Sequence, residues 1–332
     1  MKFIVLTILI VCLIILGCAK ASNPVSIDIV QEEILYPTVG IPQDMIVTET
    51  AIFVAEDQAG FSIYDRTTEN SIVRITSPDP YSYFSNIRQL AYAPYHDYLF
   101  VMDRYGPATL HLYDVSDVSN PEYLTYYIGL DVANIYYMQA YSDVDGETLI
   151  AISNTNSKFR YGTIETANWE IAEYAMPNAV RKFHIVDQYV YLAAAQRGLY
   201  IFDLESRTLI SELNMTGEAL DVRVNGDYAY VVAKQEGLLI ADISDKTNPV
   251  WIGQISTVGW AQAIDLENNY LVVGSGGGGV YLYDISHNPE QPKLLDRIPS
   301  TVVDYVLLVA LKNSKIFVAG RYKGISVFSI NR

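Results

Sequence analysis

The stretch "GLLIADISDKTNPV", residues 237–250, carries the pattern on which the predicted fold depends. A short apolar run follows Gly237 and reaches Asp242, and a polar segment with Asn248-Pro249 comes after it. Apolar runs bounded by Gly, Asn and Pro predict β-strands that end in turns. Shorter copies are "GFSIYDRTTENSI" (60–72), "GLYIFDLESRTLI" (198–210) and "GGVYLYDISHNPEQPKL" (278–294). The chain therefore repeats one strand-and-turn unit.

The repeat covers most of the 332 residues. Its aspartate, at the end of the apolar run, recurs at Asp65, Asp114, Asp203, Asp242 and Asp284. A degenerate copy, "YGTIETANWEIAEY" (161–174), lies between Asp114 and Asp203, and a last copy, "GISVFSI" (324–330), has Ser329 in place of the aspartate. Seven units at a spacing of roughly 37–52 residues indicate the blades of a β-propeller.

The unit around the opening stretch is the clearest. "ALDVRVNG" (219–226), "YAYVVA" (228–233), "LLIADIS" (238–244) and "VWIGQI" (250–255) predict four short strands with turn residues between them. The last unit of the chain lacks a fourth strand, and "VSIDIVQEEILYP" (25–37) has no unit of its own. We therefore predict an all-β fold: a seven-bladed β-propeller of four-stranded antiparallel blades over residues 25–332, closed by the N-terminal strand. The alternative, two packed β-sandwiches, is disfavoured by the even spacing.

The segment "ALDVRVNGDYAYVVAKQEGLLIADISDKTNPVWIG" (219–253) resembles the LVIVD repeat of bacterial and archaeal surface proteins. The likeness is specific in units 4 to 6, recognisable in unit 1 and weak in the others. The resemblance implies a propeller fold and an exported protein. It implies no general enzymatic activity and no catalytic residue.

The N-terminus predicts export and lipidation. Lys2 precedes an apolar run that has the length of a signal peptide and is too short to span a membrane. Ile15-Leu16-Gly17-Cys18 resembles a bacterial lipobox, which implies a signal peptide over 1–17, a lipidated Cys18 and a short tether over 18–24. An ordinary secretory signal or an uncleaved anchor is the alternative. Lipid on Cys18 would anchor the protein to the cell envelope, and Ala19 favours the outer membrane or cell surface.

The net charge of −16 argues against nucleic acid, or an anionic membrane surface, as the partner of the whole body. The recurring aspartate is interpreted as structural, since a carboxylate at a strand end can accept hydrogen bonds from the following turn. "GSGGGG" (274–279) predicts a hairpin turn. The histidines, His96, His111, His184 and His287, lack metal-ligand spacing. Asp143, Asp145 and Glu147 resemble the start of a calcium loop, although a plain turn is favoured.

Propeller geometry places the turns between second and third strands on one face, together with the connections between blades. We name it the connection face. Cations and aromatic residues of these segments predict a binding face there: Arg104, Arg160, Arg197, Lys234, Arg321, Tyr83, Tyr137 and Trp260. Polar residues that start the innermost strands predict the mouth of a central channel: Asp44, Arg88, Gln139, Lys182, Asp221, Gln262 and Asp304.

These patterns predict a lipid-anchored, non-catalytic binding or scaffold module of the cell envelope, with an envelope protein, peptide or glycan as partner. No cofactor is predicted beyond the covalent lipid. An envelope hydrolase of glycans or esters is the alternative, with Asp44, Asp221 and Asp304 as its candidate carboxylates. A purely structural envelope protein is a third hypothesis.

Overall fold

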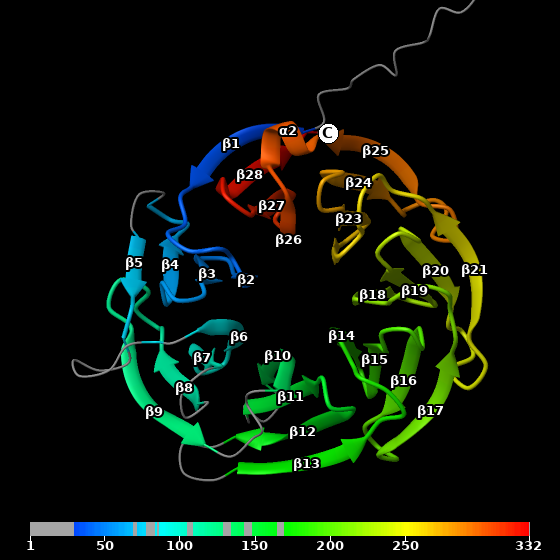
Figure 1. Cartoon of the computed structure of the whole chain (residues 1–332), viewed down its shortest axis with the longest axis horizontal. Coiled ribbons are helices and arrows are strands. Elements are labelled where there is room, and N and C mark those ends of the chain that lie inside the picture. Colours follow the sequence, from blue (N-terminus) through cyan, green and yellow to red (C-terminus); the bar gives the residue numbers. More distant parts are fainter. Residues whose placement is uncertain are drawn as a thin grey trace, which may run out of the picture.

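Seven four-stranded antiparallel sheets form a ring around a central channel (Figure 1). This computed structural model describes residues 30–68, 72–77, 84, 86–104, 109–128, 134–142, 148–164 and 169–331. In each sheet the strands follow one another from the channel outward, so the predicted seven-bladed propeller is confirmed.

The blades are built from consecutive strands. Blade 1 comprises β2 (Asp44–Val47), β3 (Ala51–Ala55), β4 (Phe61–Asp65) and β5 (Ile72–Ile75). Blade 2 comprises β6 (Ile87–Ala93), β7 (Tyr98–Asp103), β8 (Thr109–Asp114) and β9 (Glu122–Ile128). Blade 3 comprises β10 (Ile135–Ser142), β11 (Thr148–Asn154), β12 (Lys158–Ile164) and β13 (Trp169–Ala175). Blade 4 comprises β14 (Phe183–Val186), β15 (Tyr189–Ala193), β16 (Leu199–Asp203) and β17 (Thr208–Leu213).

Blades 5 to 7 complete the ring. Blade 5 comprises β18 (Asp221–Asn225), β19 (Tyr228–Val232), β20 (Leu238–Asp242) and β21 (Val250–Ile255). Blade 6 comprises β22 (Ala263–Glu267), β23 (Tyr270–Gly274), β24 (Val280–Asp284) and β25 (Lys293–Ile298). Blade 7 comprises β26 (Val306–Lys312), β27 (Lys315–Gly320), β28 (Gly324–Ile330) and β1 (Val30–Tyr36). A short helix, α2 (Ser300–Val303), lies in the connection between blades 6 and 7.

The N-terminal strand closes the ring. β1 pairs antiparallel with β28, from Val30 opposite Ile330 to Tyr36 opposite Ile325 (Figure 1). The predicted closing strand is thus confirmed over 30–36, and residues 25–29 lie outside the described residues. No helix in the described part of the chain is both long and apolar enough to cross a membrane.

The hydrophobic core lies between adjacent blades. Leu238 and Ile240 of blade 5, for example, pack with Ile264, Leu271 and Val273 of blade 6, and all five are buried. Each such side chain contributes about 1.5–3 kcal/mol when it leaves water. Because every blade packs against two neighbours, the ring fixes the positions of the innermost strands.

The recurring aspartate braces the turn after the third strand. Oδ1 of Asp242 accepts a hydrogen bond from the Ser244 amide at 2.8 Å, and Oδ1 of Asp284 accepts one from the Ser286 amide at 2.7 Å. Asp65, Asp114 and Asp203 accept equivalent amide bonds. The structural interpretation of this aspartate is confirmed.

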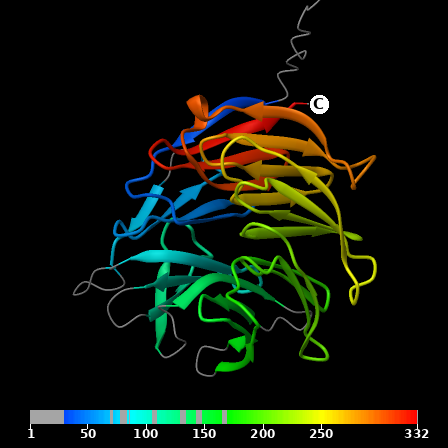
Figure 2. The same ribbon diagram turned by 45° about the vertical axis from the view of Figure 1, so that its right-hand side comes forward.

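The turns of the connection face bind the next blade. Lys234 and Ala261 exchange two backbone hydrogen bonds, and the amide of Val306 donates to the carbonyl of Gly276. In "GSGGGG" the amide of Ser275 donates to the carbonyl of Gly279 at 2.8 Å, so the predicted hairpin turn is confirmed. The first two sets of bonds join adjacent blades on the connection face. Figure 2 shows the ring obliquely, turned by 45° from Figure 1, with α2 in orange at its upper left.

Candidate functional site

Described residues of the channel line two adjoining cavities. The mouth cavity, of about 300 Å³, opens where the innermost strands begin, and its wall includes Gln43, Arg88, Gln89, Arg104, Lys182 and Gln262. The inner cavity, of about 270 Å³, lies farther along the same strands, and its wall includes Asp44, Tyr137, Gln139, Lys182, Arg223 and Asp265. Lys182 lines both cavities.

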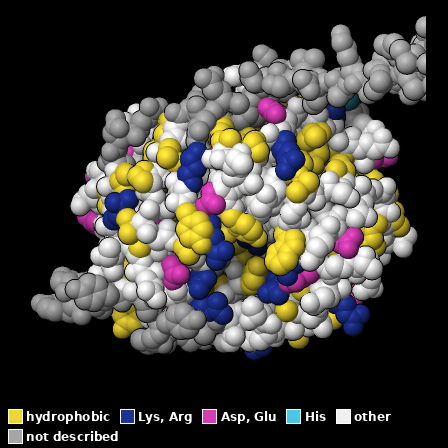
Figure 3. Space-filling view, turned by 45° about the horizontal axis from the view of Figure 1, so that its top comes forward, with side chains coloured by type: hydrophobic (Ala, Val, Ile, Leu, Met, Phe, Trp, Pro, Cys, Tyr) yellow, Lys and Arg dark blue, Asp and Glu magenta, His cyan; other side chains and the backbone are white. Residues whose placement is uncertain are grey.

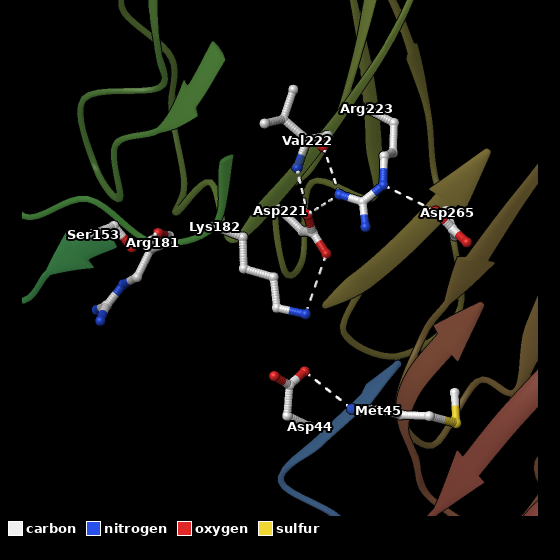
Figure 4. Close-up of polar contacts among 9 residues, drawn as sticks. All are labelled: Asp44, Met45, Ser153, Arg181, Lys182, Asp221, Val222, Arg223 and Asp265. Atoms are coloured by element: carbon white, nitrogen blue, oxygen red, sulfur yellow. Dashed lines mark hydrogen bonds and ion pairs between the residues drawn. The ribbon is translucent and has the colours of Figure 1, made fainter. Parts of the chain in front are cut away.

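Five charged side chains of the innermost strands form a cluster that we name the charged belt: Asp44, Lys182, Asp221, Arg223 and Asp265. The Lys182 ammonium lies 3.6 Å from Oδ2 of Asp221. Arg223 joins two carboxylates, with Nη1 2.8 Å from Oδ1 of Asp221 and Nε 3.0 Å from Oδ1 of Asp265. Figure 4 shows Lys182 reaching toward Asp221, with the Asp44 carboxylate on the other side of the ammonium.

The belt also binds the backbone of neighbouring blades. Oδ2 of Asp44, in blade 1, accepts a hydrogen bond from the Leu90 amide of blade 2 at 3.0 Å. Oδ2 of Asp265, in blade 6, accepts one from the Leu311 amide of blade 7 at 2.8 Å. The charges therefore tie adjacent innermost strands together.

Burial and mutual attraction set the electrostatics of the belt. Burial raises the pKa of Asp44 above its usual range, against the opposing effect of Lys182. Burial disfavours the charge of Lys182, but the carboxylates of Asp221 and Asp44 outweigh it and raise the pKa of that amine. Burial also raises the pKa of Tyr137 to about 12. Lys182 therefore stays cationic, and its ammonium lies 5.3 Å from the centre of the Tyr137 ring.

Two of the three candidate hydrolase carboxylates meet in the belt. Asp221 is 1% exposed and bound by two cations. Asp44 is 4% exposed, and its two oxygens accept the amides of Met45 and Leu90. Asp304 lies apart: it follows α2, accepts the Tyr322 amide at 2.7 Å and lines neither channel cavity. Both carboxylates are therefore engaged by ion pairs or by backbone amides.

The histidines lie in separate places. Nδ1 of His184 accepts the Val224 amide of the next blade at 3.1 Å, and burial lowers the pKa of this imidazole to about 3. Among the described residues no three His, Cys, Asp or Glu side chains gather as metal ligands would. Asp143, Asp145 and Glu147 lie outside those residues, as does Cys18, so calcium binding and lipidation stay predictions.

The residues of the predicted binding face lie in different environments in the structure. Arg160 is buried, with Nη2 2.6 Å from Glu173, so this arginine does not reach a partner. Tyr137 lies in the inner cavity and Arg104 in the mouth cavity. Tyr83 lies outside the described residues.

Three other predicted cations remain on the surface of the connection face. Arg197 and Arg321 are exposed, and the Arg321 guanidinium lies 5.7 Å from the centre of the Tyr322 ring, itself 78% exposed. Lys234 lies 5.7 Å from the centre of the Trp260 ring, which is 49% exposed. Exposed aromatic rings with cations beside them are typical of binding surfaces.

Glu218 organises the largest group of these side chains. One of its oxygens lies 2.8 Å from Arg181 and the other 2.5 Å from Lys234. Arg181 in turn lies over the Tyr136 ring at 4.7 Å, and Lys234 lies over Trp260. We name Tyr136, Arg181, Glu218, Lys234 and Trp260 the rim arc; it crosses blades 3 to 6. Figure 3 shows basic and apolar side chains close together around a hollow on this face.

Sequence reasoning missed three residues that organise the site: Glu218, Arg223 and Asp265. Glu218 comes three residues before β18, whereas Arg181 comes two residues before β14 and is equivalent in position to Leu220. Comparing equivalent positions between blades would therefore not have drawn attention to Glu218. Arg223 and Asp265 lie third in β18 and β22, and the alternation of strand residues directs them to the same side as Asp221 and Ala263.

Comparison with known proteins supports the repeat. Residues 216–257 match the LVIVD repeat family. No curated protein sequence is significantly similar to the chain.

Solved structures share the fold. The chain is similar to the structure of U3-55K, with a TM-score of 0.70 and 12% identity over 90% of this chain and 98% of that one. For the RRP9 WD40 repeats the TM-score is 0.70 and the sequence identity 12%, over 91% of this chain and 97% of that one. For the Myceliophteria thermophila Cps50 (Swd1) β-propeller domain the TM-score is 0.69 and the sequence identity 12%, over 91% of this chain and 100% of that one. These likenesses show the propeller architecture alone.

Proposed function

We propose that the protein is a non-catalytic binding module of the bacterial cell envelope that docks a carboxylate-bearing protein or peptide segment on its connection face. In this proposal the lipid on Cys18 anchors the module to the outer membrane or cell surface. The propeller fold is consistent with a binding or scaffold role. The observation that carries the proposal is the rim arc.

The rim arc offers what a docking surface needs. Glu218 holds Arg181 and Lys234 in place before any partner arrives, so less side-chain entropy is lost on binding. Two cations share one carboxylate, which leaves net positive charge beside the exposed Trp260 ring. A segment with carboxylates and apolar groups complements this surface, whereas the −16 net charge repels acidic molecules elsewhere.

The experiment is a pull-down from detergent-solubilised envelope with full-length, lipidated protein as bait. The test variant is Lys234→Gln/Trp260→Leu. The matched control is Lys246→Gln/Tyr189→Leu, which removes a second cation–aromatic pair, 6.0 Å apart, on the opposite face. We expect a partner that the wild type and the control retain and the test variant loses. A partner lost equally from both variants, or kept by both, would refute docking on the connection face.

The anchor is tested separately by detergent phase partition and mass spectrometry of the N-terminal fragment. We expect a diacylglyceryl adduct on Cys18 and loss of partition into the detergent phase for Cys18→Ala. An unmodified cysteine would contradict the lipid anchor without affecting the docking face.

A further inference from the structure

Part of the wall of the mouth cavity comes from irregularities in the pairing of the innermost strands. The register of three innermost strands shifts at their first residues: between Ile87 and Gln89 in β6, between Ile135 and Tyr137 in β10, and between Val306 and Leu308 in β26. The extra residue at each shift, Arg88, Tyr136 or Leu307, lines the mouth cavity. β2, β14, β18 and β22 pair with their neighbours in the described structure without such a shift. Bulges commonly re-aim side chains next to functional sites.

The charge of this cavity is opposite to that of the protein. Its described wall holds three cations, Arg88, Arg104 and Lys182, and no carboxylate. Arg88 donates from Nε to Oδ1 of Asn86 and from Nη1 to Oε1 of Gln43, both neutral amide oxygens. Its guanidinium is thus held in position by neutral groups, and no carboxylate in the described part of the chain pairs with its charge.

The remaining wall is rich in amide groups. Gln43, Gln89 and Gln262 line the cavity beside Tyr136 and Thr155. Oε1 of Gln89 is buried and has no hydrogen-bond partner among the described residues. A buried amide oxygen needs a donor, from water or from a ligand hydroxyl. Amides, an arginine and an aromatic ring together suit a hydroxyl-rich ring that carries a carboxylate.

We propose that the mouth cavity binds an acidic monosaccharide, with its carboxylate on Arg88 and a hydroxyl group donating to Gln89. The volume of about 300 Å³ accommodates a single sugar ring. This site shares Tyr136 with the rim arc, but the side chains assigned to the sugar, Arg88 and Gln89, lie outside that arc. The failure of one proposal therefore leaves the other standing.

The test is isothermal titration calorimetry of the full-length protein in detergent, with D-glucuronate, D-glucose and L-glutamate as probes. We expect saturable binding of glucuronate, and binding of glucose and glutamate weaker by about tenfold or more, which corresponds to 1.4 kcal/mol. Arg88→Gln is expected to weaken glucuronate binding about tenfold, while Arg207→Gln, at an exposed arginine outside the cavity, leaves it unchanged.

A second variant protects the test against misfolding. Gln89→Leu removes the unpartnered amide, so we expect unchanged or higher stability together with weaker glucuronate binding. Absence of saturable glucuronate binding, or equal binding by Arg88→Gln, would overturn the proposal. Glutamate binding as tightly as glucuronate would overturn the assignment of a sugar.

Discussion

Lys182 and Asp221 form an ion pair across the boundary between blades 4 and 5, with 3.6 Å between Nζ and Oδ2. Because Asp221 also binds Arg223, and Arg223 binds Asp265, the pair is one end of a chain of contacts that reaches blade 6. Asp265 extends the chain to the backbone of blade 7. Propeller blades contact each other mainly through side chains, so such ties fix how adjacent innermost strands are placed.

Asp221→Asn should lower the free energy of unfolding by about 3 kcal/mol, because it leaves Lys182 and Arg223 with one fewer buried counter-charge. Urea denaturation at neutral pH measures the change. The control is Asp242→Asn, in an exposed turn, for which we expect a clearly smaller loss. Equal losses in the two variants would mean that the belt does not stabilise the ring.

His184 should make stability depend on pH. Its folded-state pKa of about 3 lies below the ordinary value of 6.5, so the unfolded chain binds a proton that the folded protein does not. The contribution of His184 is therefore complete above pH 6.5 and is lost as the pH falls toward 3, by at most about 1.4 kcal/mol per pH unit.

His184→Asn tests this because Oδ1 of asparagine can replace Nδ1 as the acceptor of the Val224 amide. We expect a shallower decline of stability between pH 6.5 and 4 than in the wild type, measured by urea denaturation. His287→Gln, in an exposed turn, should keep the wild-type slope. An unchanged slope in His184→Asn would contradict the assigned pKa.

The fold was predictable because most blades use the same residue type to stabilise the same turn. Asp65, Asp114, Asp203, Asp242 and Asp284 each brace a turn from the third strand to the fourth, and that need is visible in the sequence. The seventh copy has Ser329 at this position. Its fourth strand, β1, comes from the N-terminus, so there is no turn for an aspartate to brace.

The site was less predictable because burial and pairing of long side chains depend on neighbouring blades. Arg160 belongs by sequence to a turn of the connection face, yet its side chain is buried and pairs with the exposed Glu173 of the adjacent strand. Glu218 carries no local signal of its role, since Arg181 and Lys234 come from different segments. The bulges that aim Arg88 and Tyr136 into the mouth cavity also leave no mark in the alternation of residues.

Substitution by alanine should affect stability very differently at two adjacent glycines of the hairpin at 274–279. A Cβ on Gly278 would lie 1.6 Å from the carbonyl oxygen of Val258, whereas a Cβ on Gly277 meets nothing within 4 Å. We expect Gly278→Ala to lower the free energy of unfolding by about 3 kcal/mol and Gly277→Ala to change it by less than about 1 kcal/mol. Thermal unfolding of both variants checks this, and similar melting temperatures would show that the hairpin does not contact Val258 as described.

The contribution of β1 to the stability of the ring can be measured by deleting this strand. A variant that begins at residue 37 exposes the edge of β28 and removes Ile34 and Tyr36 from the core they share with Phe317 and Ile325. We expect a loss of several kcal/mol from those two side chains and the strand hydrogen bonds, together with association through the free edge.

Urea denaturation and size-exclusion chromatography measure the two effects. The peptide VQEEILY, which is β1 itself, should restore the denaturation midpoint and the monomeric elution when added in excess, because it refills the fourth position of blade 7. A scrambled peptide of the same composition lacks the alternation that directs Ile34 and Tyr36 to the core, so it should restore neither. If the truncated protein kept the wild-type midpoint without peptide, ring closure by β1 would contribute little to stability, and the six complete blades with β26 to β28 would hold the ring by packing alone.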